Sequence, residues 1–181
     1  MKLLRRLVYV VAAALAVLLT IGLLLPDSAH VERSVTTSAS PQTVYGLVDG
    51  YARFNEWSPW ADLDPATRYT YSGPPTGVGA RLEWRSDKPE VGSGSQEIVA
   101  VEPGRRVTTK LDFGTQGTAT STMSIEPEGT GSRITWSIDA SFEGRFLERY
   151  FGLFFDRLIG PDYEKGLSRL AALAEATPPA P

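Results

Sequence analysis

Residues 133–142, RITWSIDASF, alternate apolar and polar side chains without interruption. The apolar side chains are Ile134, Trp136, Ile138, Ala140 and Phe142, and the polar ones between them are Thr135, Ser137, Asp139 and Ser141. Because successive side chains of a strand point to opposite faces, this pattern predicts a strand with one covered face and one face in water. Such strands are typical of an antiparallel sheet.

The same alternation recurs upstream, in segments separated by turns rich in glycine and proline. Residues 105–113 repeat it, with Val107, Thr109, Leu111 and Phe113 on one side. Further strands are predicted at residues 30–38, 67–72, 79–85, 95–102 and 118–126. Short turn-rich connections favour a meander, in which consecutive strands pair.

Three helices accompany these strands in the soluble part of the chain. Ser40 as N-cap and Pro41 in the first turn predict a helix over residues 41–48, and a second short helix is expected over residues 51–57. Apolar residues at helical spacing predict a long helix over residues 144–176, with a kink at Gly160-Pro161. A sheet with one apolar face needs a cover, and only this last helix is long enough to supply it. A ligand pocket is expected between the two.

The N-terminal segment is of a different kind. Residues 7–25 contain no charged side chain, and nineteen residues of helix rise about 28 Å, close to the hydrocarbon thickness of a bilayer. Pro26 follows and is expected to end the helix. We therefore predict a transmembrane anchor over residues 7–26, with a basic end at residues 1–6.

A cleaved signal peptide is the alternative interpretation of this segment. Its apolar region would normally be shorter, and the charged Asp27 stands two residues before Ala29, where a small residue is expected. The basic residues Lys2, Arg5 and Arg6 favour a cytoplasmic N-terminus, which places the rest of this single-pass inner-membrane protein outside the cytoplasm. The soluble domain is expected over residues 30–176 and a disordered tail over residues 177–181.

Composition excludes several classes of function. The 181 residues carry 18 basic and 21 acidic side chains, so the basic excess of a nucleic-acid-binding protein is missing. The chain has no cysteine, which excludes disulfides and thiolate metal sites. His30, the one histidine, is interpreted as a linker residue, and neither a metal nor another cofactor is expected.

The order of these elements resembles the START-like helix-grip fold. The sequence is similar to the polyketide cyclase/dehydrase and lipid-transport branch of the SRPBCC superfamily, over about residues 31–175. The matching segments are Ser40-Pro41-Gln42-Thr43-Val44-Tyr45, Trp57-Ser58-Pro59-Trp60, Gly77-Val78-Gly79-Ala80 with Trp84, Gly92-Ser93-Gly94, Thr135-Trp136 and Gly166-Leu167-Ser168-Arg169-Leu170. The resemblance implies an α+β fold, with a curved antiparallel sheet of about seven strands over the C-terminal helix. It does not imply one activity, because such folds serve carriers, receptors and enzymes alike.

No catalytic constellation is recognisable from the residues. A nucleophile triad is excluded, and Gly77-Val78-Gly79 leads into a strand and not into the helix that a dinucleotide loop requires. Asp62 and Asp64 are interpreted as a solvated turn in preference to an acid/base pair. Arg81, Glu83, Arg85 and Glu97 are expected to form ion pairs on the wet face of the sheet.

Large apolar side chains on the predicted inner surfaces are the candidates for lining a pocket. They are Trp57, Trp60, Leu82, Trp84, Phe113, Met123, Trp136, Tyr150 and Phe154. Binding sites are mostly apolar with a few polar groups, but the same side chains can also simply fill a core. Core packing is favoured for Trp136 and Leu111, a place at the pocket rim is open for Trp60, and Tyr150 either orients a ligand or is a capped buried hydroxyl.

Three functions remain open at this point. The favoured one is a membrane-anchored domain that binds a small hydrophobic molecule or lipid and has no nucleic-acid partner. A binding role is favoured over a catalytic one. A polyketide cyclase or dehydratase is the second, for which Tyr150, Asp156 and Arg157 are the available groups, and a cavity carboxylate with a strongly shifted pKa would support it. An interaction domain of the cell envelope with a filled core is the third, and a large exposed apolar patch would favour it.

Overall fold

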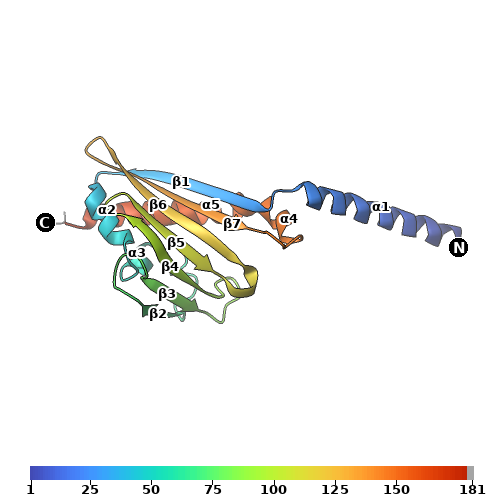
Figure 1. The fold of residues 1–181 in the computed structure, drawn as a ribbon, viewed down its shortest axis with the longest axis horizontal. Coiled ribbons are helices and arrows are strands. Elements are labelled where there is room, and N and C mark those ends of the chain that lie inside the picture. Colours follow the sequence, from blue (N-terminus) through green and yellow to red (C-terminus); the bar gives the residue numbers. More distant parts are fainter. Residues whose placement is uncertain (179–181) are drawn as a thin grey trace.

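Seven antiparallel strands form one sheet in the order β1-β7-β6-β5-β4-β3-β2 in the computed structural model, which describes residues 1–178 (Figure 1). The strands are β1 (Ser28–Thr37), β2 (Arg68–Ser72), β3 (Arg81–Arg85), β4 (Ser93–Glu102), β5 (Arg106–Asp112), β6 (Thr118–Glu128) and β7 (Gly131–Ser141). From β2 to β7 each strand pairs with the next along the chain, and β1 closes the order beside β7. The seven-stranded antiparallel sheet expected from the sequence is therefore confirmed.

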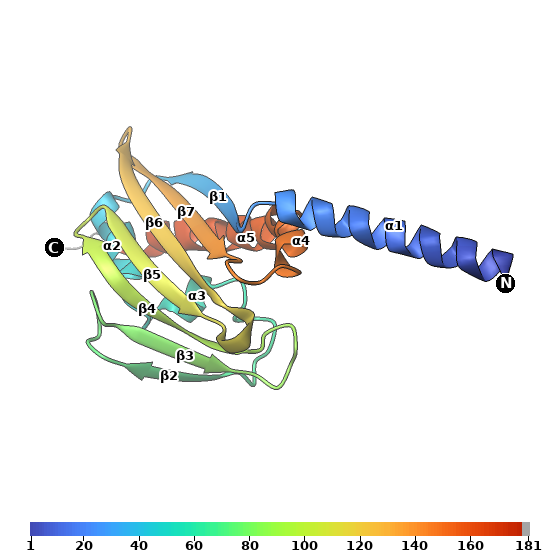
Figure 2. The ribbon, with the colours of Figure 1, turned by 45° about the vertical axis from the view of Figure 1, so that its right-hand side comes forward.

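The helices cover the concave face of this sheet. They are α2 (Pro41–Val48), α3 (Phe54–Trp57), α4 (Glu148–Gly152) and α5 (Phe155–Ala176), while the apolar helix α1 (Lys2–Leu24) extends away from the domain (Figures 1 and 2). Ser40 caps α2, since its hydroxyl oxygen accepts a hydrogen bond from the Thr43 N–H at 3.2 Å. Helix α5 runs along β1 and β7 and crosses the curved sheet.

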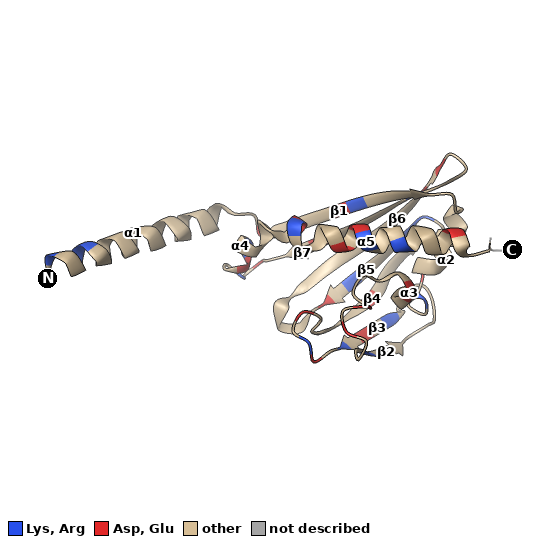
Figure 3. Ribbon diagram, turned by 180° about the vertical axis from the view of Figure 1, so that it is seen from behind, with Lys and Arg blue, Asp and Glu red and all other residues tan. Residues whose placement is uncertain are grey.

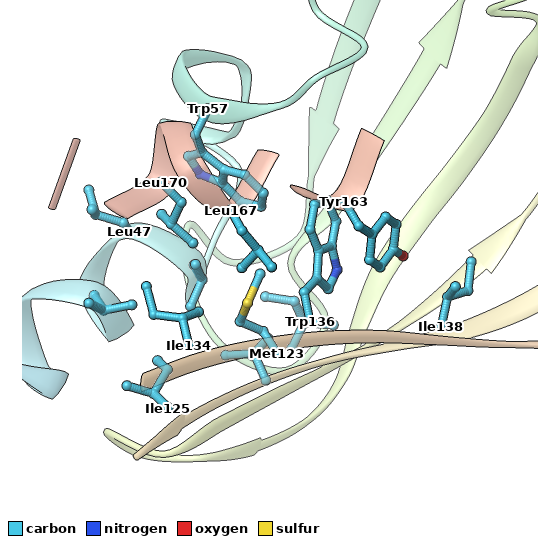
Figure 4. Close-up of a cluster of buried hydrophobic side chains, with 14 of the residues drawn as sticks. Leu47, Trp57, Met123, Ile125, Ile134, Trp136, Ile138, Tyr163, Leu167 and Leu170 are labelled. Carbon is cyan, nitrogen blue, oxygen red and sulfur yellow. The ribbon is translucent and has the colours of Figure 1, made fainter. Parts of the chain in front are cut away.

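The core lies between α5 and the central strands (Figure 4). Leu167 and Leu170 of α5 are 1% and 0% exposed, and they face the row formed by Ile134 and Ile125, which are paired across β7 and β6. These are the positions that the alternating pattern assigned to the covered face. The opposite face carries the expected ion pairs of Arg81 with Glu83 at 3.0 Å and with Glu97 at 3.2 Å.

The C-terminal helix differs from the prediction. One helix over residues 144–176 was expected, but the chain turns after Gly144, forms the short helix α4 and begins α5 only at Phe155. Pro161, at the predicted kink, lies inside α5, and the helix continues past it. Residues 153–154 separate α4 from α5.

Arg33 of β1 fastens the first turns of α5 to the sheet. Its guanidinium donates two hydrogen bonds to Asp156, at 2.8 and 3.1 Å, and one to Glu164 at 2.7 Å. The hydrogen bonds from Arg33 hold the pKa of Asp156 below its usual value. The Arg33 side chain crosses α5 at Gly160, where any side chain would overlap the guanidinium.

Helix α1 is long and apolar enough to span a membrane. Its most apolar window has a mean hydropathy of 2.7, and only 6% of that window is buried within the described chain. Lysine and arginine occur only near its N-terminal end (Figure 3). By length and composition the helix fits either a membrane span or a signal sequence.

Two details at the ends of the domain change earlier expectations. His30 is not a linker residue, because it lies in β1 and its Nδ1 atom is 2.7 Å from a carboxylate oxygen of Asp139 in β7. Thr177, placed in the predicted disordered tail, accepts a hydrogen bond from Arg53 at 3.3 Å and donates one to the carbonyl of Leu173. Residues 179–181 of that predicted tail lie outside the described residues.

Candidate ligand-binding cavity

A cavity of about 430 Å³ lies between the inner face of the sheet and α5. Residues from the helices α2 to α5 and from six of the strands, β2 to β7, line it. Its lining includes the loop 89–92, Phe113 and Gln116, which lie at the sheet end where β3 and β5 finish and β4 and β6 begin. Because Ser28 and Ser141 pair at the same end, this is also the end of the domain from which α1 and α4 continue.

Aromatic rings form the inner wall of the cavity. Trp136 of β7 stacks on Tyr163 of α5, with ring centroids 3.9 Å apart and planes 15° apart (Figure 4). Trp57 and Trp60 meet the Trp136 ring edge to face, at 5.4 and 5.8 Å. The Trp136 N–H donates to the Ser121 hydroxyl at 2.8 Å, so its one polar group is satisfied as burial requires.

Two glycines make room for these rings. A Cβ on Gly166 of α5 would lie 2.7 Å from the ring of Trp136 and 3.1 Å from Pro59, so the helix can approach the ring only without a side chain there. On β4, a Cβ at Gly94 would lie 2.5 Å from the ring of Trp84, its cross-strand partner. Both glycines belong to segments on which the family resemblance rests.

Trp84 and Phe113 form the outer wall, with ring centroids 5.9 Å apart. The Trp84 N–H donates to the carbonyl of Val91 at 3.3 Å and so holds the loop 89–92, which lines the cavity. Asp64 fixes the same border from the other side, because it accepts hydrogen bonds from the Ser86 hydroxyl and, at 3.0 Å, from the Ala66 N–H. These contacts hold the pKa of Asp64 below its usual value.

A small polar area interrupts the apolar lining on the sheet side. Gln96 of β4 and Thr109 of β5 both line the cavity, as does Tyr51, and Thr109 lies close to the Tyr51 hydroxyl. The nearby hydroxyl of Tyr51 is buried without a hydrogen-bond partner in the described chain, and burial raises its pKa to about 12. A buried polar group without a partner costs free energy, so a ligand that hydrogen-bonds here would recover it.

Charged groups are nearly missing from the lining. Within the described residues, Glu90 on the bordering loop is the one carboxylate that touches the cavity. The two aspartates considered from the sequence are structural: Asp62 pairs with Lys165 at 3.7 Å and with Arg169, while Asp64 is 6% exposed and was wrongly interpreted as solvated. No cluster of three or more residues able to hold a metal ion occurs in the described part of the chain.

Seven of the nine side chains predicted to line a pocket do so. They are Trp57, Trp60, Leu82, Trp84, Phe113, Met123 and Trp136. Tyr150 and Phe154 lie outside the cavity: Tyr150 reaches α1, where its hydroxyl donates to the carbonyl of Leu18, and Phe154 is 57% exposed. Both belong to the stretch where one continuous helix was expected, and the break before α5 turns them away.

The polar area was missed from the sequence. Thr109 stands in the inward row of its strand between Val107 and Leu111, so its position was visible although its role was not considered. Gln96 lies opposite Leu82 and Leu111, which assigns it to the same face once the register is known. Tyr51 comes from a loop, whose side-chain directions the alternating pattern does not predict.

Residues 28–175 match the family model described as polyketide cyclase / dehydrase and lipid transport. The chain belongs to this family. The match covers the whole sheet together with α5 almost to its end, and begins just after α1. A comparison with curated proteins found no match.

Solved structures from the same fold are numerous and distant in sequence. The di-domain ARO/CYC StfQ from the steffimycin biosynthetic pathway has a TM-score of 0.60 at 13% identity, over 82% of this chain and 51% of that one. Ara h 8.0201 has a TM-score of 0.57 at 13% identity, over 83% and 99% of the two chains. A protein of Rhizobium leguminosarum has a TM-score of 0.57 at 14% identity, over 83% and 97%. At these identities the family's fold is what the chains share.

Proposed function

We propose that this domain binds a small, uncharged and largely apolar molecule, such as a lipid, and that α1 holds it in a membrane. The observation that carries the proposal is the cavity itself, whose volume of about 430 Å³ falls within the range of small-molecule sites. Its aromatic walls suit an apolar body, and the missing charges disfavour an ionic one. The family description, which includes lipid transport, supports the same class of ligand.

The polar area supports a more specific feature of the ligand. The Gln96 amide and the Thr109 and Tyr51 hydroxyls all have hydrogen atoms to donate. The ligand is therefore expected to carry an acceptor, such as a carbonyl or ester oxygen, at that end. Its apolar part would extend along Trp136 towards the opening.

Direct identification of the ligand tests this function. The full chain is purified from its host membranes in mild detergent and measured by native mass spectrometry, which is expected to detect a co-purified apolar molecule. Binding of a fluorescent fatty-acyl ester is then compared between the natural protein and Leu111→Trp, which fills the cavity, with Val99→Trp on the exposed part of β4 as the matched control.

We expect Leu111→Trp to weaken probe binding at least tenfold, since it takes volume that the ligand needs, while Val99→Trp leaves binding unchanged. Thr109→Val is expected to weaken binding of the ester but not of a plain hydrocarbon of the same length. Equal binding by the natural protein and Leu111→Trp would contradict the proposal, and so would a chain that binds no apolar probe.

Cyclase chemistry has less support from the arrangement of the residues. Asp156, the carboxylate considered for it, is bound to Arg33 and is not among the residues that line the cavity. The phenol of Tyr163 is fully buried, and burial raises its pKa, so it is a poor base at neutral pH. The relation to StfQ keeps this activity as the second candidate, to be tested by incubation with a poly-β-ketone chain.

A further inference from the structure

One segment of the domain exposes far more apolar surface than the rest. Of the nine large apolar side chains exposed in residues 30–178, five lie within the twelve residues from 147 to 158. They are Leu147 (78% exposed), Phe151 (47%), Leu153 (59%), Phe154 (57%) and Leu158 (50%). Burial of the core explains none of them, and we call this segment, residues 147–158, the apolar edge. Apolar side chains gathered in this way mark an interaction surface.

The apolar edge lies directly against α1. The Tyr150 hydroxyl donates to the carbonyl of Leu18, and Phe146 packs against Gly22, where a side chain would overlap its ring. Arg149 donates to the carbonyl of Leu25 at 3.4 Å. These contacts place α4 beside the last two turns of α1 (Figures 1 and 2).

The depth of this contact identifies the surroundings of the apolar edge. Leu18 lies six residues before the end of α1 at Leu24, which is about 9 Å of helix. If those turns lie in the outer part of a bilayer, the apolar edge lies there too, at the depth of about 5–10 Å where interfacial segments insert. Leu23 and Leu24 at the end of α1 are exposed like Leu153 and Phe154, and for a membrane span the surroundings of such side chains are lipid.

The charges in and beside the apolar edge are compatible with a lipid surface, because its two carboxylates, Glu148 and Asp156, are paired with Arg145 and Arg33. Arg149 and Arg157 make no ion pair within residues 1–178, and the Arg149 Nε–H is buried without a hydrogen-bond partner there. Arginines beside inserted apolar side chains are placed to meet lipid phosphates. A protein partner would be expected to supply carboxylates to both.

The apolar edge also reaches the cavity. Phe151 belongs to the apolar edge and also lines the cavity. Ile159, which directly follows the apolar edge in the sequence, lines the cavity as well. The loop that borders the cavity lies at the same end of the sheet. A ligand that leaves the cavity past Phe151 would therefore reach the apolar edge and not open water.

From these contacts we propose that residues 147–158 form a membrane-docking surface, inserted in the lipid beside α1, through which the cavity exchanges its ligand with the bilayer. This proposal rests on the proposed function for the nature of the ligand and for α1 as a membrane span. The insertion itself is measured without any ligand, so the two can fail separately.

Depth measurement with spin labels tests the docking. The chain has no cysteine, so Leu153→Cys and Leu158→Cys each give a single labelling site in the full chain. Val78→Cys is the matched control, because Val78 is similarly exposed (56%) but lies in the turn between β2 and β3, at the opposite end of the sheet. The labelled chains are placed in phosphatidylcholine/phosphatidylglycerol nanodiscs, and collision rates with oxygen and with a water-soluble nickel chelate are recorded.

We expect the labels at positions 153 and 158 to collide preferentially with oxygen, as inserted groups do, and the label at 78 to collide preferentially with nickel. Equal nickel accessibility at positions 153 and 78 would overturn the proposal. Spin–spin broadening at 153 that disappears when labelled chains are diluted with unlabelled ones would also overturn it, since a second copy would then cover the edge.

Exchange of ligand provides the second arm. Leu153→Asp with Leu158→Asp changes only exposed positions outside the cavity. This double variant is expected to bind a fluorescent fatty-acyl ester in detergent as the natural chain does, but to exchange it with its bilayer about tenfold more slowly. Unchanged exchange would contradict the proposed route, whereas lost binding in both proteins would contradict the proposed function.

Discussion

The two halves of α5 face the same sheet but are used differently. In the C-terminal half, Leu167 and Leu170 are at most 1% exposed and belong to the core that includes residues of β6, β7 and α2. Towards the N-terminal end, Leu158 is half exposed, and Ile159 and Tyr163 line the cavity. The difference teaches that one part of the helix holds the fold together while the other borders the cavity and a surface that is not needed for folding.

Truncating one apolar side chain in each half of α5 tests this difference with the largest expected effect. Leu170→Ala is expected to lower the free energy of unfolding by about 2–5 kcal/mol, because it leaves a cavity in a fully buried region. Leu158→Ala is expected to change it by less than about 0.5 kcal/mol, because the side chain is 50% exposed. Denaturant unfolding in detergent, followed by tryptophan fluorescence, measures both. Similar losses would mean that the two halves contribute equally to stability.

Adding a methyl group to the buried side of α5 is expected to change the free energy of unfolding by a smaller amount. Gly166→Ala is expected to destabilise the fold by about 1–3 kcal/mol, because the new Cβ would press on Trp136 and Pro59. Gly46→Ala in α2 is the matched control, since a Cβ there meets nothing within 4 Å and should stabilise the helix by about 0.5–1 kcal/mol. Thermal unfolding of both variants gives the sign of each effect, and a stabilising Gly166→Ala would contradict the close packing described for the ring.

The smallest effect is expected at Arg33 of β1, which binds Asp156 and Glu164 in the N-terminal half of α5. The pKa of Asp156 is lowered in the folded protein, so its contribution to stability is present above the unfolded pKa of about 4 and is lost as the pH falls through the lower folded value. Arg33→Gln should therefore lower Tm slightly at pH 7 and reduce the loss of stability between pH 5 and pH 3. Melting curves over this range are the measurement, and an unchanged acid dependence would show that the pair contributes nothing.

Much of the fold could be predicted because it follows from local periodicity. The alternation that includes Val107, Leu111 and Phe113 indicates which face of the strand is covered. Ser40-Pro41 indicates a helix start through capping and backbone geometry alone. The same reasoning brought most of the predicted pocket residues to one cavity. The prediction was wrong for Tyr150 and Phe154, because the apolar spacing continues through residues 144–176 although the chain forms two separate helices there.

The parts that could not be predicted depend on contacts between residues far apart in the sequence, or are apolar side chains that the fold leaves exposed. His30 acquires its partner Asp139 only when β1 pairs with β7, more than one hundred residues away. The polar area needs two strands and a loop to meet before Gln96, Thr109 and Tyr51 become neighbours. The exposed side chains of residues 147–158 follow the same apolar spacing as core residues, so the pattern alone does not separate them from the core.

The junction between α1 and the domain sets the distance over which this protein can act. Only Leu25, Pro26 and Asp27 separate α1 from β1, and three residues extend about 10 Å at most. Asp27 is itself held, since its carbonyl accepts a hydrogen bond from the Phe142 N–H at 2.6 Å. With α1 in a bilayer, the domain stays at the surface of that membrane and does not act as a soluble carrier between membranes. Any molecule that it receives from another membrane or from a soluble enzyme must be brought to it.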